Sequence, residues 1–424
     1  MPGSGTAHTP TATAIDMHVA ISAWFWNQPM TGSGQYVRRL VDHLPTIAPD
    51  IEITLIAPFP IGLPAEAPRI RAVETPRAGF LRGGNIGKVK FEQVTFPRTC
   101  VRIGADVAHV PYWASPLRPR VPTLVTIHDL IPLLLPEYRK SWLVRAYTAL
   151  VNQSTHAATS VLTDSQASKQ DIVTYLKLAP SRVRTVYLAA DAPFRPEPDP
   201  RDAAIRRHYG LPGRYILYLG GFDVRKNIST LLKAYGLAQS ALGPVCPLVI
   251  AGRLPEKDSA FTPDPLRLAG EYDVDTQSVY TTGFVEEADK PALYRGATAM
   301  AFPSRYEGFG LPVLEAMACG TPVLGARASS IPEIVGSGGL LISPDDVDGH
   351  PELQRRGGGR LPAGGGGGAG PGVRARRWWS SWCQCSHPVR DATAIADPPV
   401  ESRPGLGEPR PQPAGRPRTR RGAP

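Results

Sequence analysis

Short apolar runs rich in β-branched residues alternate with segments of helical period from residue 15 to residue 343. Parallel sheets produce this pattern, because each strand must be followed by a crossover, usually a helix, before the next parallel strand begins. The strands fall into two series, and an aperiodic, proline-rich stretch at 187–200 separates them. We therefore predict an α/β protein with two doubly wound domains that face each other across a cleft.

The pattern also predicts the order of the domains along the chain. We expect a disordered N-terminus at 1–14, a first domain at 15–190, a hinge or linker at 191–213 and a second domain at 214–348, followed by a low-complexity, disordered tail at 349–424. The expected strands are 15–22, 51–57, 106–111, 123–129 and 160–165 in the first domain, and 215–221, 247–252, 279–284, 299–304 and 321–326 in the second. The expected helices include 34–44, 142–153, 227–241, 288–297 and 311–319.

The charge distribution argues against a nucleic-acid partner. The chain has a formal charge of +10, but residues 349–424 hold thirteen arginines, no lysine and five acidic residues. The tail therefore carries +8 of the total, and a nucleic-acid-binding protein remains a rival interpretation that rests on the tail alone.

Two further absences in the sequence bear on location. The first fourteen residues lack the basic and apolar regions of a signal peptide, and no apolar run reaches the roughly 18 residues of a membrane span. Five scattered cysteines favour a reducing compartment. We expect a cytoplasmic protein, whose contact with the inner face of the membrane, where it occurs, is peripheral.

The stretch SRYEGFGLPVLEAMACGTPV at 304–323 places two carboxylates, Glu307 and Glu315, on either side of a glycine-rich turn. The apolar segment that follows predicts a helix, with Pro312 near its first turn, where a missing N–H has no cost. The free amides of Gly308, Phe309, Gly310 and Leu311 then lie at the positive end of the helix dipole, which suits a phosphate or a sugar hydroxyl. The plainer alternative is that Glu307 is a helix-start charge and Glu315 belongs to a solvated face.

Two other stretches place charged or titratable side chains at strand ends. In GGFDVRKN, Arg225 and Lys226 come just before an expected helix, so two cations suit a diphosphate leaving group unless they form a solvated pair. His128 ends the strand TLVTIHD, and the adjacent Asp129 either fixes the tautomer of His128 or caps the turn. No further ligand follows at a spacing that suits a metal, so we expect none.

These stretches together resemble the retaining glycosyltransferases of the GT-B fold, in particular glycosyltransferase family 4. Glu307 and Glu315 match the Glu-x7-Glu signature of that family, and the similarity extends from about residue 15 to about residue 346. Three other stretches are similar in the expected order, and they are TGSGQYVRRL (31–40), TIHDLIPLLLPEY (126–138) and LGGFDVRKNISTLLKAY (219–235). The stretch VYTTGFVEEADKPALY (279–294) resembles the strand end at which the family binds the nucleobase. Many family members carry another arginine where this chain has Gly220 and Gly221, so the positive charge here depends on Arg225 and Lys226.

The resemblance implies a fold of two Rossmann-like domains and a role for each matching residue. It places His128 beside the reacting sugar, and it assigns Glu307 to the hexose and Glu315 to the ribose of a nucleotide-sugar donor. The glycines Gly32 and Gly34 become a donor loop, and backbone groups near Val285 meet the nucleobase. No cofactor is implied.

The resemblance further implies the reaction and its substrates. It implies retaining transfer from a nucleoside-diphosphate sugar to a glycan or lipid-linked acceptor. The HDLIPLLLPEY segment favours GDP-mannose over UDP-glucose. The alternative is a non-catalytic nucleotide-sugar-binding protein.

The tail carries one further prediction. Members of the family continue past this point with helices that complete the second domain, whereas glycine, proline and arginine without periodicity follow residue 348 here. We predict that residues from about 349 onward are the product of a frameshift, that the second domain is incomplete and that activity is impaired. The other two reading frames of the coding DNA test this prediction.

Overall fold

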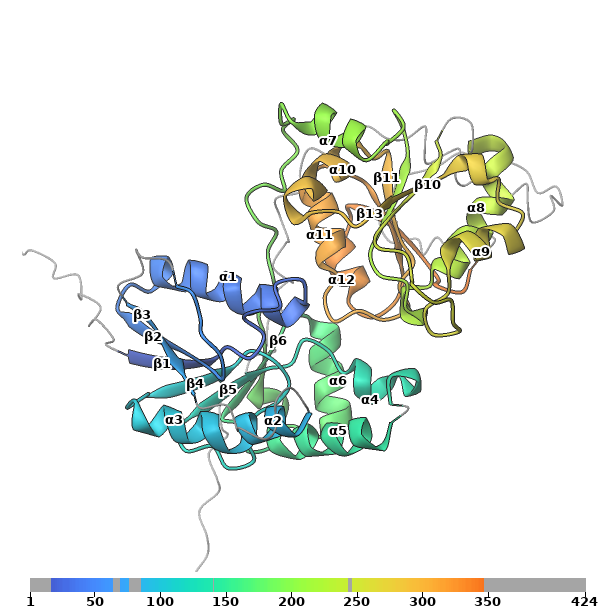
Figure 1. Ribbon diagram of the computed structural model, residues 1–424. Coiled ribbons are helices and arrows are strands. Elements are labelled where there is room, and N and C mark those ends of the chain that lie inside the picture. Colours follow the sequence, from blue (N-terminus) through green and yellow to red (C-terminus); the bar gives the residue numbers. More distant parts are fainter. Residues whose placement is uncertain (1–16, 64–68, 76–84, 140, 243–245, 347–424) are drawn as a thin grey trace, which may run out of the picture.

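The computed structural model describes residues 17–63, 69–75, 85–139, 141–242 and 246–346. Within these ranges the chain forms two all-parallel sheets, each with helices on both faces (Figure 1). The predictions for the N-terminus at 1–14 and for the tail at 349–424 lie outside the described residues. The predicted α/β fold with two Rossmann-like sheets is confirmed.

The first sheet has seven strands in the order β3-β2-β1-β4-β5-β6-β7. Its strands are β1 (Met17–Ser22), β2 (Ile51–Ala57), β3 (Ile70–Glu74), β4 (Val107–Val110), β5 (Thr123–Thr126), β6 (Ser160–Thr163) and β7 (Val183–Thr185). Its helices are α1 (Gly32–Ile47), α2 (Asn85–Lys90), α3 (Phe96–Arg102), α4 (Ile131–Leu134), α5 (Trp142–Thr155) and α6 (Gln166–Leu176), with a π-helical turn at Phe91–Thr95 and 3₁₀ turns at Pro136–Tyr138 and Pro180–Arg182.

The second sheet has six strands in the order β10-β9-β8-β11-β12-β13. Its strands are β8 (Ile216–Leu219), β9 (Leu248–Ala251), β10 (Val279–Gly283), β11 (Ala299–Phe302), β12 (Val323–Ala326) and β13 (Gly339–Ile342). Its helices are α7 (Asp202–His208), α8 (Ile228–Leu242), α9 (Pro265–Glu271), α10 (Lys290–Gly296), α11 (Leu311–Ala318) and α12 (Ile331–Val335), with 3₁₀ turns at Val224–Lys226, Thr276–Ser278 and Glu287–Asp289.

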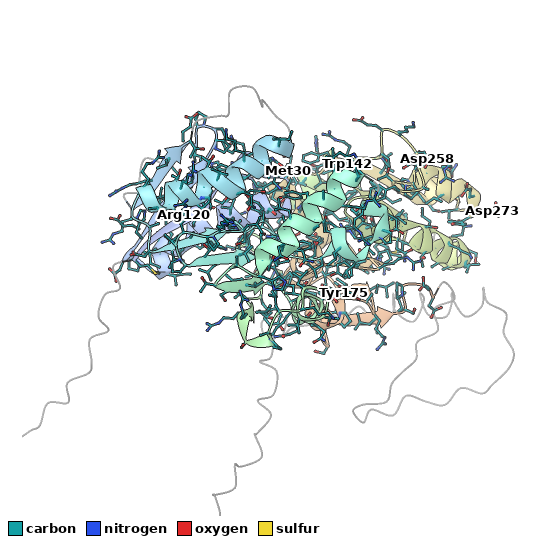
Figure 2. All side chains as sticks on the ribbon, turned by 90° about the horizontal axis from the view of Figure 1, so that it is seen from below. Met30, Arg120, Trp142, Tyr175, Asp258 and Asp273 are labelled. Carbon is teal, nitrogen blue, oxygen red and sulfur yellow. The ribbon has the colours of Figure 1, made fainter. Side chains whose placement is uncertain are left out.

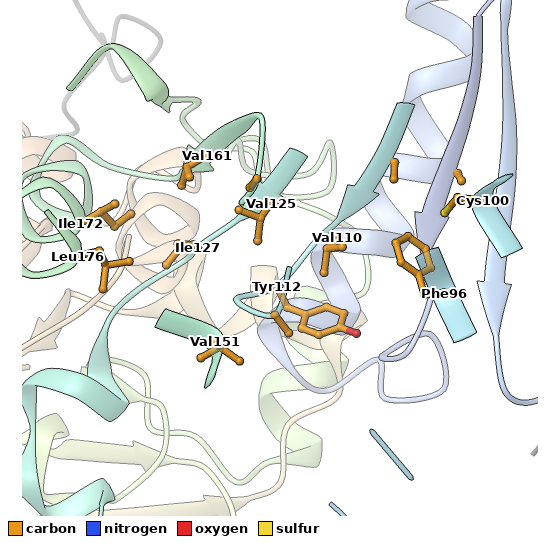
Figure 3. Packing of buried hydrophobic residues seen from close by; sticks show 14 of the residues in the cluster. Phe96, Cys100, Val110, Tyr112, Val125, Ile127, Val151, Val161, Ile172 and Leu176 are labelled. Carbon is orange, nitrogen blue, oxygen red and sulfur yellow. The ribbon is translucent and has the colours of Figure 1, made fainter. Parts of the chain in front are cut away.

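Side-chain alternation along the strands fills the core on both faces of each sheet. In β1, Val19 and Ile21 pack with Val37 of α1, whereas Ala20 between them points to the other face. Figure 3 shows the cluster on that second face, where strands β4 to β6 meet α5 and α6. In β8, Ile216 packs on the face covered by α8, whereas Leu217 packs on the opposite face, which α11 covers.

The segment between the two sheets is only partly irregular. Residues 187–200 contain no helix or strand, but α7 follows within the stretch that we expected to be a linker, and it packs against α10 of the second sheet. Arg295 of α10 donates to both carboxylate oxygens of Asp202, at 2.8 and 2.6 Å. The part of this stretch from residue 202 onward is therefore joined to the second sheet.

Large apolar side chains at the surface come from separate elements. Met30 precedes α1, Trp142 begins α5 and Tyr175 lies in α6, and each is at least half exposed (Figure 2). Single exposed apolar residues of this kind are ordinary on protein surfaces. None of the helices in the described part of the chain is both long and apolar enough to cross a membrane.

Candidate active site

The topology of the second sheet places the candidate residues at one edge. Strands β8 and β11 are neighbours, and the chain leaves them toward opposite ends of the sheet, through β9 and β12 respectively. In open α/β sheets such a switch point forms the crevice where ligands bind, at the carboxyl ends of the strands. Arg225 and Lys226 follow β8, and Glu307 follows β11, so the structure brings these three predicted residues together.

Glu307 forms an ion pair with each of the two cations. Its Oε2 lies 2.7 Å from Nη1 of Arg225, and its Oε1 lies 2.7 Å from Nζ of Lys226. The three side chains are between 11% and 15% exposed. Burial alone would raise the pKa of Glu307, but Lys226 and Arg225 outweigh it and hold that pKa below its ordinary value. The carboxylate is therefore ionised and already holds both cations, so it is not a helix-start charge in solvent.

The glycine-rich turn between β11 and α11 touches the first sheet. A Cβ on Gly308 would lie 2.3 Å from the carbonyl oxygen of His128, which belongs to the loop after β5. The carbonyl oxygen of Gly308 accepts hydrogen bonds from the hydroxyls of Ser165 and Ser168, at 2.6 and 2.9 Å. The space that a side chain at position 308 would need is therefore occupied by the backbone of the other domain.

The start of α11 presents amide donors. Gly310 is the residue before the helix and has φ +111°, a conformation that favours glycine, and Phe309 is buried in the core of the second domain. Among the described residues, none accepts a hydrogen bond from the amides of Gly308, Phe309, Gly310 and Leu311. These amides and the helix dipole favour an anion at this position.

Glu315 is buried inside α11 and not on a solvated face. Its Oε2 accepts a hydrogen bond from the hydroxyl of Tyr294 in α10, at 2.9 Å. Burial raises the pKa of Glu315 above its ordinary value, although Lys290 acts in the opposite direction. The described structure therefore joins Glu315 to α10, and it shows no contact between Glu315 and Glu307.

His128 is held by an acid from the neighbouring strand. Its Nδ1 lies 2.6 Å from Oδ2 of Asp164, which directly follows β6, and its Nε2 lies 3.3 Å from the carbonyl oxygen of Pro111. Both partner atoms are oxygens that can accept hydrogen bonds, so this environment favours the form of the imidazole in which both ring nitrogens carry a proton. Burial acts to lower the pKa of His128, but Asp164 outweighs it and the net pKa is raised.

Asp129 does not hold the histidine. Its Oδ1 accepts a hydrogen bond from the amide of Ile131 at 3.0 Å, so it caps the turn before α4. Of the two alternatives for this residue, the structure supports the cap. The ring of Tyr36 instead lies edge-on against His128, with centroids 4.9 Å apart.

The predicted donor loop at Gly32 and Gly34 and the predicted base contact at Val285 differ in how closely other groups pack around them. A Cβ on Gly34 would lie 2.0 Å from the carbonyl oxygen of Gln28, so the turn before α1 requires glycine there. Beside Gly32 there is open space. Val285 is buried in the core after β10, while the preceding Phe284 is 40% exposed and lies under the guanidinium of Arg253, 5.7 Å from its ring centroid.

Several residues around the site were not singled out from the sequence. Asp164 could have been found, because acids after neighbouring parallel strands lie at the same edge of a sheet and β5 pairs with β6. Tyr138 and Asp223 contact each other across the two domains, and no local pattern signals such a contact. Over the described residues, no group of three or more His, Cys, Asp or Glu side chains is arranged to hold a metal ion.

Comparison with known proteins agrees with this geometry. Residues 30–192 match a model described as Glycosyltransferase Family 4, and residues 203–350 match one described as Glycosyl transferases group 1. The chain belongs to the glycosyltransferases of the family 4 type. The second match covers Arg225, Lys226, Glu307 and Glu315, so the predicted signature lies inside it.

Curated relatives of the family include two bacterial mannosyltransferases. The O-antigen chain mannosyltransferase B of Escherichia coli is 34% identical over 226 residues, which are 53% of this chain and 58% of that protein. The MMP alpha-(1->4)-mannosyltransferase of Mycolicibacterium hassiacum is 26% identical over 78% of this chain and 87% of that protein. This chain therefore spans little more than half the length of the first of these relatives.

Solved structures confirm the GT-B fold. Sucrose-phosphate synthase from Thermosynechococcus elongatus has a TM-score of 0.59 at 22% identity, covering 78% of this chain and 87% of that one. WaaG, a glycosyltransferase involved in lipopolysaccharide biosynthesis, has a TM-score of 0.59 at 15% identity, covering 86% of this chain and 90% of that one.

Proposed function

We propose that this protein transfers mannose from GDP-mannose to a hydroxyl group of a glycan or lipid-linked acceptor, with retention of the anomeric configuration. The observation that carries the proposal is the meeting of Arg225, Lys226 and Glu307 at the switch point, beside the start of α11. Mannose is supported by the names of the two curated relatives, both of which are mannosyltransferases.

The leaving diphosphate is the group that the second domain stabilises. Arg225 and Lys226 supply positive charge, and the amides at the start of α11 supply donors that no described residue occupies. Such fixed donors stabilise charge that develops during a reaction, because they need no reorganisation at that moment. Transfer from a nucleoside-diphosphate sugar develops its charge on this diphosphate.

The transfer step follows from that placement. The acceptor hydroxyl attacks the anomeric carbon on the face from which the diphosphate leaves. The bond from the anomeric carbon to the phosphate oxygen breaks as the bond to the acceptor oxygen forms, and the hydroxyl proton passes to the departing phosphate. Positioning supplies much of the rate, since the reacting groups are held at the same cleft.

The remaining residues bind and orient the donor on this proposal. His128, which Asp164 holds in place, and Glu307 orient the hexose, and Glu315 binds the ribose. Backbone groups near Val285 meet the base, and Gly32 and Gly34 form the donor loop. The acceptor enters from the first domain. The protein works in the cytoplasm, with peripheral contact to the inner face of the membrane where the acceptor is lipid-linked.

Binding and turnover test the proposal separately. Calorimetric titration with GDP and UDP measures donor preference, and tighter binding of UDP would overturn GDP-mannose. Transfer of labelled mannose to a panel of glycan and lipid-linked acceptors then tests catalysis. Binding without transfer to any acceptor would favour the non-catalytic alternative.

The assigned role of Glu307 gives a sharper test. Glu307→Ala should lower kcat by about 100-fold, the loss expected when the group that orients the hexose for transfer is removed, and should change donor affinity much less. Glu307→Gln keeps the size of the side chain and should behave in the same way. Exposed Glu271 pairs with Arg267 and with no other residue that the structure describes, so Glu271→Ala is the matched control. Wild-type turnover in both Glu307 variants would refute the role.

A further inference from the structure

Tyr138 of the first domain contacts the segment after β8 in the second domain, which carries Asp223 and Arg225. It ends the 3₁₀ turn after α4, and its hydroxyl donates to Oδ1 of Asp223 at 2.5 Å. The same hydroxyl accepts from Nε of Arg225 at 3.3 Å. The ring lies edge-on against Phe261, with centroids 4.9 Å apart. Tyr138 therefore contacts both Arg225 and Asp223, and Asp223 forms an ion pair with Arg225.

The contacts of Arg225 account for two of its three nitrogens. Nε contacts Asp223 at 3.2 Å and Tyr138, and Nη1 donates to Oε2 of Glu307 at 2.7 Å and to the carbonyl oxygen of Tyr306 at 3.1 Å. Within the part of the chain that the structure describes, Nη2 has no partner. The guanidinium is planar, so fixing Nε and Nη1 also fixes the direction in which Nη2 presents its donors.

We infer that Tyr138 is a positioning residue that orients Arg225 toward the second phosphate of the donor, and that it does so only when the two domains are docked. The inference rests on the proposed function, because it takes Arg225 as a ligand of the leaving diphosphate. Tyr138 lies in the chain between β5 and β6, whereas Arg225 and Asp223 follow β8. Docking of the first domain is therefore what completes the environment of Nε.

The protonation state of the tyrosine is consistent with this task. Burial, followed by the hydrogen bond to Asp223, raises the pKa of Tyr138 to about 12. The hydroxyl consequently keeps its proton over the working pH range and remains a donor to the carboxylate. Arg225 also keeps its charge, since Glu307 and Asp223 outweigh the effect of burial and raise its pKa.

If the contact of Tyr138 were purely structural, we would expect a different effect on nucleotide binding. If Tyr138 only held the domains together, removing its hydroxyl would weaken the binding of a nucleoside monophosphate and a nucleoside diphosphate equally. A positioning role predicts that the loss falls on the second phosphate alone. The ratio of the two dissociation constants therefore separates the explanations.

The variant Tyr138→Phe removes the hydroxyl and keeps the ring against Phe261. Calorimetry would first show whether GDP or UDP binds the wild type more tightly. It would then compare the monophosphate and the diphosphate of that nucleoside, guanosine or uridine. We expect the monophosphate to bind as in the wild type and the affinity ratio to fall by about two- to tenfold, the usual effect of one hydrogen bond. Asp223→Asn, which removes the charge that holds Nε, should lower the same ratio.

Tyr187→Phe is the matched control. The hydroxyl of Tyr187 also makes a contact with the second domain, donating to Oε2 of Glu333 at 3.2 Å, but it does not contact Arg225. This control should keep the wild-type ratio. A wild-type ratio in both Tyr138→Phe and Asp223→Asn would overturn the inference. A wild type that binds the diphosphate no better than the monophosphate would refute the leaving-group site itself, and the inference with it.

Discussion

Glu333 should control how firmly the two domains dock. It lies in the first turn of α12, and its two carboxylate oxygens accept from the amides of Gln166 and Ala167 at 2.9 and 3.0 Å. These amides begin α6 in the first domain, where a negative charge is favourable. A hydrogen bond to a charged group contributes about 1.5 kcal/mol at the low end of its range, so the two bonds together contribute about 3 kcal/mol. Since 1.4 kcal/mol is a tenfold change, Glu333→Ala should shift the docking equilibrium by about 100-fold toward the open form.

Small-angle X-ray scattering and kinetics would measure this shift. We expect Glu333→Ala to increase the radius of gyration without ligand and to lower kcat/KM, because the proposed site takes residues from both domains. The control Glu271→Ala removes an exposed carboxylate that pairs within α9, and it should change neither quantity. Wild-type scattering together with wild-type kcat/KM in Glu333→Ala would refute the reasoning.

Two further predictions concern the loop after β5. Gly308→Ala places a Cβ 2.3 Å from the carbonyl oxygen of His128, and overpacking of about 1–3 kcal/mol should lower kcat/KM at least severalfold, whereas Gly270→Ala, with open space around it, should not. The pKa of His128 is raised from 6.5, so its contribution to stability is complete below pH 6.5 and is lost as the pH rises through the folded-state pKa. Urea unfolding should therefore show a larger stability gap between wild type and His128→Gln at pH 6 than at pH 9; a gap that is constant or grows with pH would contradict this.

The sequence predicted the strands that are buried on both faces, and it also predicted β10, whereas the partly exposed strands β3, β7 and β13 were missed. Strands such as β8 and β9 are continuous apolar runs, and their positions follow from composition alone. In contrast, β3 (Ile70–Glu74) is an edge strand with mostly exposed side chains, and β7 (Val183–Thr185) has three residues. Neither offers the periodicity from which a strand is recognised.

Some residues of the candidate site could be named from the sequence, whereas their contacts could not. Arg225, Lys226 and Glu307 could be named because each follows a recognisable strand, but their ion pairs depend on β8 and β11 being neighbours. The reason for glycine at position 308 could not be found from the sequence, because the atom that excludes a side chain belongs to the other domain. The hydrogen bond from Tyr294 to Glu315 likewise depends on how α10 packs against α11.

The first turn of α6 should become exposed to solvent when the two domains separate. The hydroxyl of Ser165 accepts from the amide of Ser168 within the first domain and donates to the carbonyl oxygen of Gly308 in the second. Separation of the domains would take away that bond and the Glu333 acceptors together, leaving the amides of Gln166 and Ala167 open to solvent. The hydrogen–deuterium exchange rates of these two amides thus report how often the two domains separate, although neither residue is placed at the substrate.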